Sequence, residues 1–149
     1  RGTYKMLHLP DGLSQDSLHM LMTCEPQIKE IGDLISRTDV LLFGIGTAMR
    51  MADQRHIADD VRKQLVDNHA VGEALGQYCD IDGKLIYSTN NIGLSLPDVA
   101  KIPNVIAVAG GQDKSSAIIG VMRACQKGIL IIDEQAAEGM RQLLQISAL

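Results

Sequence analysis

The sequence predicts an α/β fold of three layers, in which helices cover a mostly parallel sheet. Three apolar runs indicate strands buried on both faces: 40–43 (VLLF), 104–108 (NVIAV) and 129–132 (ILII). Each run leads through a turn into a helical pattern, and strands that alternate with helices favour parallel pairing. The chain of 149 residues is long enough to bury one core, and no repeat or linker divides it.

Ahead of the first apolar run, the pattern predicts a short strand and a broken helix. Residues 4–9 (YKMLHL) read as the strand, which the Pro-Asp-Gly at 10–12 would end. Ser14 or Ser17 would open the helix, and Pro26 would restart it. The restarted helix carries apolar residues at helical spacing, namely Ile28, Ile31, Leu34 and Ile35.

Between the first and second apolar runs, the sequence predicts helical and then hairpin structure. Residues 47–66 form a loosely amphipathic helical pattern, and 69–78 (HAVGEALGQY) read as a functional loop or short helix. Alternating residues on either side of Asp82-Gly83 predict a β-hairpin over 79–88. An irregular connection at 90–104 leads to the second run.

After the second and third apolar runs, two further helices are expected. The first covers 113–126 (DKSSAIIGVMRACQ), and the second covers 134–146 (EQAAEGMRQLLQI). The predicted order is therefore strand, helix, strand, helix, hairpin, strand, helix, strand, helix.

Composition and charge exclude several classes of function. The net charge of −4, the single Phe and the lack of Trp leave neither a basic stripe nor a stacking platform for nucleic acid. No run of about 18 apolar residues predicts a transmembrane helix, and the first residues lack the apolar region of a signal peptide. We therefore expect a cytoplasmic protein that does not contact the membrane.

Histidine and cysteine spacing argues against metal and disulfide sites. The four histidines form neither an HxH nor an HExxH motif, so no metal is expected. The three cysteines (Cys24, Cys79 and Cys125) are dispersed and odd in number, which favours a reducing compartment. We expect them to serve as small buried apolar residues.

Two glycine turns lie at the ends of predicted strands, where parallel sheets bind ligands. Gly44 and Gly46 follow the first strand, and Gly110 and Gly111 follow the second. Their helices would point free N–H groups at a bound anion, and Lys114 would add a positive charge. These residues suit a phosphate, although glycines after strands often serve only tight turns.

Other polar residues near these turns have two interpretations each. Thr47 offers a hydroxyl donor, and Arg50 and Arg55 either reach a second anion or are surface charges. Glu73 either accepts hydrogen bonds from sugar hydroxyls or is a solvated residue. Asp133 either caps the last helix, which we prefer, or forms an acid–base pair with Glu134. A dinucleotide site is not indicated, because the third glycine and the acidic residue of that motif are missing.

Five segments in order carry a resemblance to the effector-binding domain of the SorC-type (DeoR-related) bacterial transcriptional regulators. They are YKMLHLPDGLS, DVLLFGIGTAMRMA, AVGEALGQYCDIDGKLI, IPNVIAVAGGQDKSSAI and LIIDEQAA. The resemblance implies the fold of the ribose-phosphate isomerase, glucosamine-phosphate deaminase and CoA-transferase group. It also implies that residues 1–149 form the C-terminal part of the effector domain, and that the helix-turn-helix lies N-terminal to this chain.

The resemblance further implies a function. The domain would sense a sugar phosphate, first of all fructose-1,6-bisphosphate, for a repressor of glycolytic genes. Gly44, Gly46 and Thr47 would line the pocket, Arg55 and Lys114 would contact phosphate, and Glu73 would face sugar hydroxyls. No cofactor is implied. Dimers or tetramers would bind operator DNA through the missing N-terminal domain.

Two other functions compete with this sensor. A sugar-phosphate isomerase or deaminase of the same fold group would use Glu73 or Asp133 as a general base. An oligomerisation module would carry a pocket without a function. The sequence favours the sensor, and therefore a protein that is not an enzyme.

Overall fold

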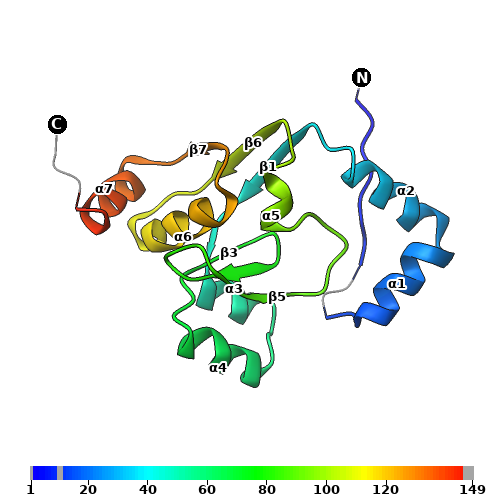
Figure 1. The fold of residues 1–149 in the computed structure, drawn as a ribbon, viewed down its shortest axis with the longest axis horizontal. Coiled ribbons are helices and arrows are strands. Elements are labelled where there is room, and N and C mark those ends of the chain that lie inside the picture. Colours follow the sequence, from blue (N-terminus) through cyan, green and yellow to red (C-terminus); the bar gives the residue numbers. More distant parts are fainter. Residues whose placement is uncertain (1, 10–11, 146–149) are drawn as a thin grey trace.

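A parallel sheet of three strands organises the protein (Figure 1). A computed structural model describes residues 2–9 and 12–145. The strand order is β1 (Val40–Gly44), β6 (Asn104–Val108) and β7 (Ile129–Ile131), and both pairings are parallel. The three apolar runs therefore form the predicted strands, and the mixed α/β class with a parallel sheet is confirmed.

Helices that follow the strands pack against one face of this sheet. They are α5 (Leu96–Val99), α6 (Ser115–Cys125) and α7 (Glu134–Leu143), with a short 3-10 helix, η1 (Gln112–Lys114), before α6. Phe43, Val105 and Ala107 on the sheet are buried in one cluster with Ile118 and Val121 of α6. Removal of this apolar surface from water is the main stabilising contribution to the domain.

The opposite face of the parallel sheet is exposed, which differs from the prediction that these strands are buried on both faces. Val40 and Leu42 of β1 are 57% and 67% exposed, and Ile129 and Ile131 of β7 are also exposed. The apolar runs thus predicted the strands correctly, but they could not predict which face of the sheet is covered.

A second sheet, antiparallel and of four strands, lies beside the first. Its order is β2 (Gly46–Thr47), β3 (Gly72–Ala74), β4 (Gln77–Cys79) and β5 (Leu85–Ser88). The predicted hairpin at Asp82-Gly83 is confirmed, because β4 pairs with β5 and Gly83 adopts a φ of 84°.

The predicted loop or helix at 69–78 is wrong. This segment forms a tight hairpin of β3 and β4, with Leu75 and Gly76 as its two-residue turn. Both turn residues have positive φ, 55° and 78°. Sequence reasoning failed here because leucine rarely adopts that conformation, so no turn signal was visible. Glu73 lies in this segment, so its position could not be predicted from the sequence.

The N-terminal half of the chain confirms one prediction and corrects two. α1 (Gln15–Cys24) is capped by Ser14, and α2 (Pro26–Ile35) starts at Pro26 as predicted. Residues 4–9 form no strand and join neither sheet, and Lys5 in this segment contacts Glu30 of α2 at 2.9 Å. The helical region 47–66 is two helices, α3 (Ala48–Gln54) and α4 (Asp59–Asp67), separated where His56 takes a φ of 49°.

Candidate functional site

Most of the residues proposed from the sequence as ligand contacts meet at one cavity of about 460 Å³. The cavity lies where β1 ends, beside β2, the start of α3 and the β3–β4 turn. Six of the eight predicted residues line it, namely Gly44, Gly46, Thr47, Arg55, Glu73 and Lys114.

The pairing of strands explains why residues far apart in sequence converge here. Gly44 is the partner of Val108 in the parallel sheet, so the loops after β1 and β6 lie at the same edge. Gly46 is the partner of Glu73 in the antiparallel sheet, which places this carboxylate beside the first glycine loop.

Among the residues that the structure describes, Glu73 is the single carboxylate that lines the cavity, and its side chain is held in place. The residue is 3% exposed. Its Oε1 accepts a hydrogen bond from the amide of Gly76 at 2.7 Å and an ion-pair contact from Arg55 Nη2 at 3.2 Å. A Cβ built on Gly46 would lie 3.8 Å from Oε2, so the second oxygen faces the glycine loop.

Positive charge exceeds negative charge in the cavity. Arg50, Arg55 and Lys114 line it together with Glu73. Arg55 pairs with Glu73, whereas the side chains of Arg50 and Lys114 donate no hydrogen bond or ion pair to any other residue that the structure describes. Such a pair of cations around a cavity favours an anion.

Thr47 precedes α3 at the N-cap position, but its side chain makes no capping hydrogen bond. The hydroxyl is therefore not used by the helix that follows, and the residue lines the cavity. A threonine hydroxyl in that position is able to donate to a phosphate oxygen or a sugar hydroxyl.

Gly110 and Gly111 do not line the cavity. The amide of Gly111 donates instead to both carboxylate oxygens of Asp133, at 2.9 and 3.1 Å. A Cβ on Gly110 would lie 2.7 Å from Asp133 Oδ2. An internal carboxylate thus occupies the position at this turn where the sequence suggested a phosphate.

Asp133 caps α7, as preferred from the sequence. Its Oδ1 accepts from the amide of Ala136 at 2.8 Å. The amides of Ala136 and Gly111 hold the pKa of this carboxyl below its usual value, because they stabilise the charged form. The acid–base pair of Asp133 with Glu134 therefore receives no support from the geometry.

Six lining residues were not singled out from the sequence as site residues: Phe43, Ile45, Met51, Gln54, Leu75 and Val108. Gln54 lies four residues after Arg50 on α3, so helical spacing was a usable signal for it. Leu75 reaches the cavity from the unpredicted β3–β4 turn, and no sequence signal pointed to it.

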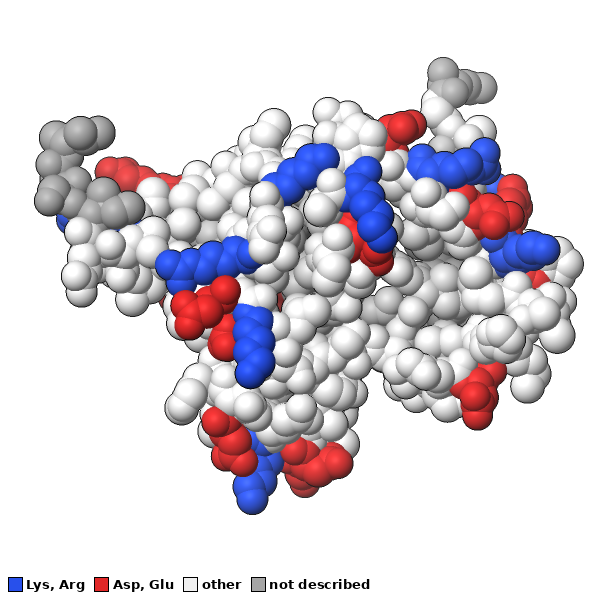
Figure 2. All heavy atoms as spheres, in the orientation of Figure 1, with Lys and Arg blue, Asp and Glu red and all other residues white. Residues whose placement is uncertain are grey.

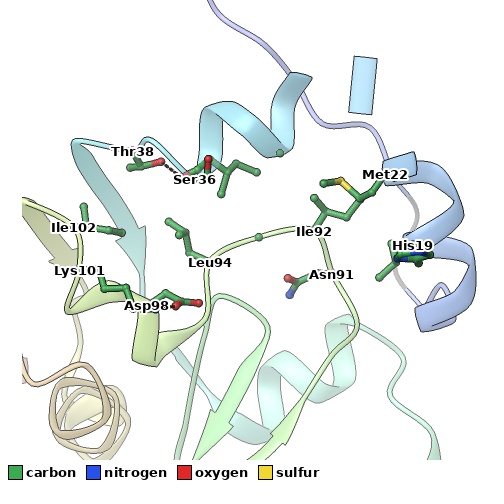
Figure 3. A pocket seen from close by; sticks show the side chains of 14 residues that line it. His19, Met22, Ser36, Thr38, Asn91, Ile92, Leu94, Asp98, Lys101 and Ile102 are labelled. Carbon is green, nitrogen blue, oxygen red and sulfur yellow. Dashed lines mark hydrogen bonds and ion pairs between the residues drawn. The ribbon is translucent and has the colours of Figure 1, made fainter. Parts of the chain in front are cut away.

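A larger cavity, of about 690 Å³, lies between the pair α1–α2 and residues 91–102 (Figure 3). Its lining is mainly apolar and includes Met22, Ile92 and Leu94. Its acidic and basic residues, Asp98 and Lys101, pair with each other at 2.7 Å. Because these charges are already matched, this cavity is a weaker candidate for an anionic ligand despite its size.

Metal-ligand motifs and a basic stripe are absent from the sequence, and the described residues bear on both features. No three His, Cys, Asp or Glu side chains there converge as metal ligands would. Basic and acidic side chains are interspersed on the face shown in Figure 2, without a continuous basic stripe. Among residues 2–9 and 12–145, no helix has the length and apolar character that a membrane span requires.

The cysteines occupy two environments, and one expectation about them is wrong. Cys79 and Cys125 are buried, and burial raises the pKa of their thiols to about 12 and about 11. Cys24, expected to be buried as well, is exposed on α1. Helix α1 packs against α2 and leaves this end uncovered.

Comparison with known sequences supports a sugar-binding role. Residues 1–142 match the model of the family described as "Putative sugar-binding domain". The chain is 37% identical over 137 residues to the Central glycolytic genes regulator of Bacillus subtilis, and 38% identical over 135 residues to that of Priestia megaterium. The two alignments cover 92% and 91% of this chain. They cover only 40% and 39% of the length of the two relatives.

Solved structures agree in fold. A SorC family transcriptional regulator from Enterococcus faecalis superposes with a TM-score of 0.85 at 38% identity, over 93% of this chain and 56% of that one. The full-length sorbitol operon regulator SorC from Klebsiella pneumoniae superposes with a TM-score of 0.69 at 23% identity, over 86% and 42%, which shows a shared fold. The protein therefore belongs to the family of sugar-binding domains of SorC-type transcriptional regulators.

Proposed function

We propose that the cavity beside the first glycine loop binds the phosphate of a sugar phosphate, fructose-1,6-bisphosphate in the first instance. In this proposal the domain is the effector sensor of a transcriptional repressor of glycolytic genes. The observation that carries it is the charge of the cavity, where three cationic side chains face one carboxylate.

Lys114 and Arg50 are the groups we assign to the phosphate. Neither forms an ion pair with another described residue, so neither needs to break a contact to receive an anion. A hydrogen bond to a charged group contributes about 1.5–3 kcal/mol. Two such contacts contribute about 3–6 kcal/mol, and micromolar binding requires about 8 kcal/mol, so contacts to the sugar would supply the rest.

The sugar would lie against Glu73 and Thr47. The Oε2 atom of Glu73 faces the Gly46 loop, and carboxylate oxygens accept hydrogen bonds from hydroxyl groups. Arg55 has two roles in this proposal, because it neutralises Glu73 and lines the same cavity. The volume of about 460 Å³ lies within the range usual for small-molecule sites.

The effector would act by shifting the populations of two arrangements of a homo-oligomer, a dimer or a tetramer, in the bacterial cytoplasm. A ligand shifts such an equilibrium only by the difference in its affinity for the two states. The relatives named as glycolytic gene regulators support this role. Operator DNA would be bound by a part of the polypeptide outside the sugar-binding domain.

The competing function, a sugar-phosphate isomerase or deaminase, is less favoured. Of its two candidate bases, Asp133 does not line the cavity and is engaged by the amides of Gly111 and Ala136. The relatives that match this chain are named as regulators rather than enzymes.

A thermal-shift titration of the polypeptide that carries this domain tests the proposal. Fructose-1,6-bisphosphate is compared with fructose and with inorganic phosphate, on the wild type, Lys114→Ala and the matched control Lys63→Ala. A ligand at a hundred times its dissociation constant stabilises the folded state by about 2.7 kcal/mol. We expect the bisphosphate to raise Tm in the wild type and the control, and not in Lys114→Ala. Equal shifts in all three proteins would contradict the assignment of the site.

A further inference from the structure

The β3–β4 turn carries part of the candidate site. Leu75 lines the cavity from this turn, and the amide of Gly76 donates to Glu73 Oε1 at 2.7 Å. Both turn residues have positive φ, 55° for Leu75 and 78° for Gly76. Leucine rarely adopts such a conformation, and it persists only where surrounding contacts hold it. The contacts that hold this turn therefore bear on the cavity itself.

Two side chains of the segment after β5 hold the turn, and we call Thr89 and Asn91 the turn clamp. Asn91 Nδ2 donates to the carbonyl of Leu75 at 3.2 Å and to Thr89 Oγ1 at 3.4 Å. Thr89 donates twice to the carbonyl of Gly76, through its amide at 2.8 Å and its hydroxyl at 3.0 Å. The same two side chains would clash with a Cβ on Gly76, so they lie directly against the turn.

One peptide group links the turn clamp to Glu73. The carbonyl of Leu75 and the amide of Gly76 belong to the same planar unit, so they turn together. Asn91 binds the carbonyl end of this unit, and Glu73 binds its N–H end. Rotation of this unit, once Asn91 is lost, would carry the N–H away from the carboxylate. The side-chain amide of Asn91 thus fixes the donor that orients Glu73.

The turn clamp acts from outside the cavity beside the first glycine loop. Neither of its residues lines that cavity, whereas Asn91 lines the larger cavity beside α1 and α2 (Figure 3). We propose that Thr89 and Asn91 are positioning residues, which hold Glu73 in the orientation that receives a sugar hydroxyl. This inference rests on the proposed function, because it takes Glu73 as the contact for the sugar. The described hydrogen bonds of the turn clamp reach the β3–β4 turn and not Lys114, so binding of a phosphate alone should not depend on it.

Calorimetry on the whole polypeptide tests the turn clamp through two ligands, fructose-1,6-bisphosphate and inorganic phosphate. Asn91→Ala is compared with Asn90→Ala, because Asn90 carries the same side chain but donates to the carbonyl of Leu13 at 3.3 Å. We expect Asn91→Ala to weaken binding of the bisphosphate roughly three- to tenfold, the factor of one net hydrogen bond, and to leave phosphate binding unchanged. Asn90→Ala should bind both ligands as the wild type does. Unchanged binding of the bisphosphate by Asn91→Ala, or a parallel loss for both ligands, would overturn the proposal.

Two further comparisons separate positioning from a general loss of structure. Thr89→Val removes the hydroxyl and Thr89→Ser keeps it, so the serine variant should bind the bisphosphate more tightly than the valine variant. In the Glu73→Gln background, Asn91→Ala should cost little further affinity, because the effects of residues that act through one contact do not add. Equal binding by the two Thr89 variants, or full additivity in the double variant, would count against positioning through Glu73.

Hydrogen exchange of the Gly76 amide gives a readout that needs no ligand. This N–H is bound to Glu73, so loss of the turn clamp should raise its exchange rate roughly three- to tenfold in Asn91→Ala. The rate should stay at the wild-type value in Asn90→Ala. An unchanged rate in Asn91→Ala would refute the turn clamp alone. Failure of fructose-1,6-bisphosphate to bind the wild type would refute the proposed function, and with it the sugar contact of Glu73.

Discussion

The two glycine turns at the ends of β1 and β6 look alike in sequence and differ in the structure. Gly44 and Gly46 open onto a cavity lined by cationic side chains. The amide of Gly111 donates to the carboxylate of Asp133, an exposed residue of the same chain, and this carboxylate occupies the turn. A glycine turn after a strand therefore indicates room for an anion, and the rest of the fold decides whether the anion is a ligand or a side chain.

The largest effect we expect is the reversal of charge at Lys114, which lines the cavity although it follows the filled turn. Lys114→Glu should weaken binding of fructose-1,6-bisphosphate by roughly 100-fold or more, because a charged hydrogen bond is lost and repulsion is added. Isothermal titration calorimetry measures the change. Lys63→Glu, on the exposed surface of α4, should bind as the wild type does. Equal losses in both variants would remove Lys114 from the site.

Gly111→Ala should affect stability strongly and binding little. The residue has a φ of 95°, and a Cβ there would lie 2.6 Å from Asp113 Oδ1. Strain of this kind costs about 1–3 kcal/mol. Gly44→Ala is the matched change in the other turn, where the nearest atom to a Cβ is the carbonyl oxygen of Val108 at 3.9 Å. Denaturant unfolding should show a loss of stability for Gly111→Ala alone, and comparable losses would refute the contrast between the turns.

Glu73→Gln should reduce the selectivity of the cavity for a sugar. The variant keeps an acceptor for Gly76 but removes the charge that pairs with Arg55. We expect roughly tenfold weaker binding of fructose-1,6-bisphosphate, from one weakened hydrogen bond to a hydroxyl. Binding of inorganic phosphate should be unchanged or tighter, because the cavity becomes more positive. A parallel fall in both affinities, measured by calorimetry, would assign Glu73 a structural role only.

The smallest effect concerns the pH dependence of the filled turn. The amides of Ala136 and Gly111 lower the pKa of Asp133 from its usual 3.8 in the folded state. A lowered pKa stabilises the fold above pH 3.8, and this contribution is lost as the pH falls through the folded value. Asp133→Asn should therefore lower Tm slightly near neutral pH, and its Tm should approach that of the wild type as the pH falls below 3.8. A constant difference across this range would show that the charge of Asp133 does not matter.

Sequence patterns predicted the parallel sheet and its helices because those elements depend on local features. The apolar runs at 40–43, 104–108 and 129–132 specify strands, and Ser14, Pro26 and Asp133 specify the ends of helices. Only the second hairpin of the antiparallel sheet, β4–β5, was predicted. The β3–β4 hairpin was missed, because it turns at Leu75, a residue type that does not indicate a turn. The exposure of Leu42 could not be predicted from the sequence, because a run of apolar residues does not indicate which face of the sheet is covered.

The candidate site likewise contains some residues whose meeting could be predicted from the sequence and others whose meeting could not. Gly44, Gly46, Thr47 and Lys114 follow strand ends, so topology alone predicted that they meet. The antiparallel sheet pairs Glu73 with Gly46, and an ion pair links Glu73 to Arg55; neither contact could be read from the sequence. Gly111 was misread because its partner, Asp133, lies 22 residues away and was recognised only as a helix cap.

A crystal structure of the polypeptide with fructose-1,6-bisphosphate tests the central claim most directly. We expect a phosphate within hydrogen-bonding distance of Lys114 Nζ in the cavity beside Gly46, with the amide of Gly111 still bound to Asp133. A phosphate that displaces Asp133 from Gly111, or a ligand in the larger cavity beside α1 and α2, would contradict it.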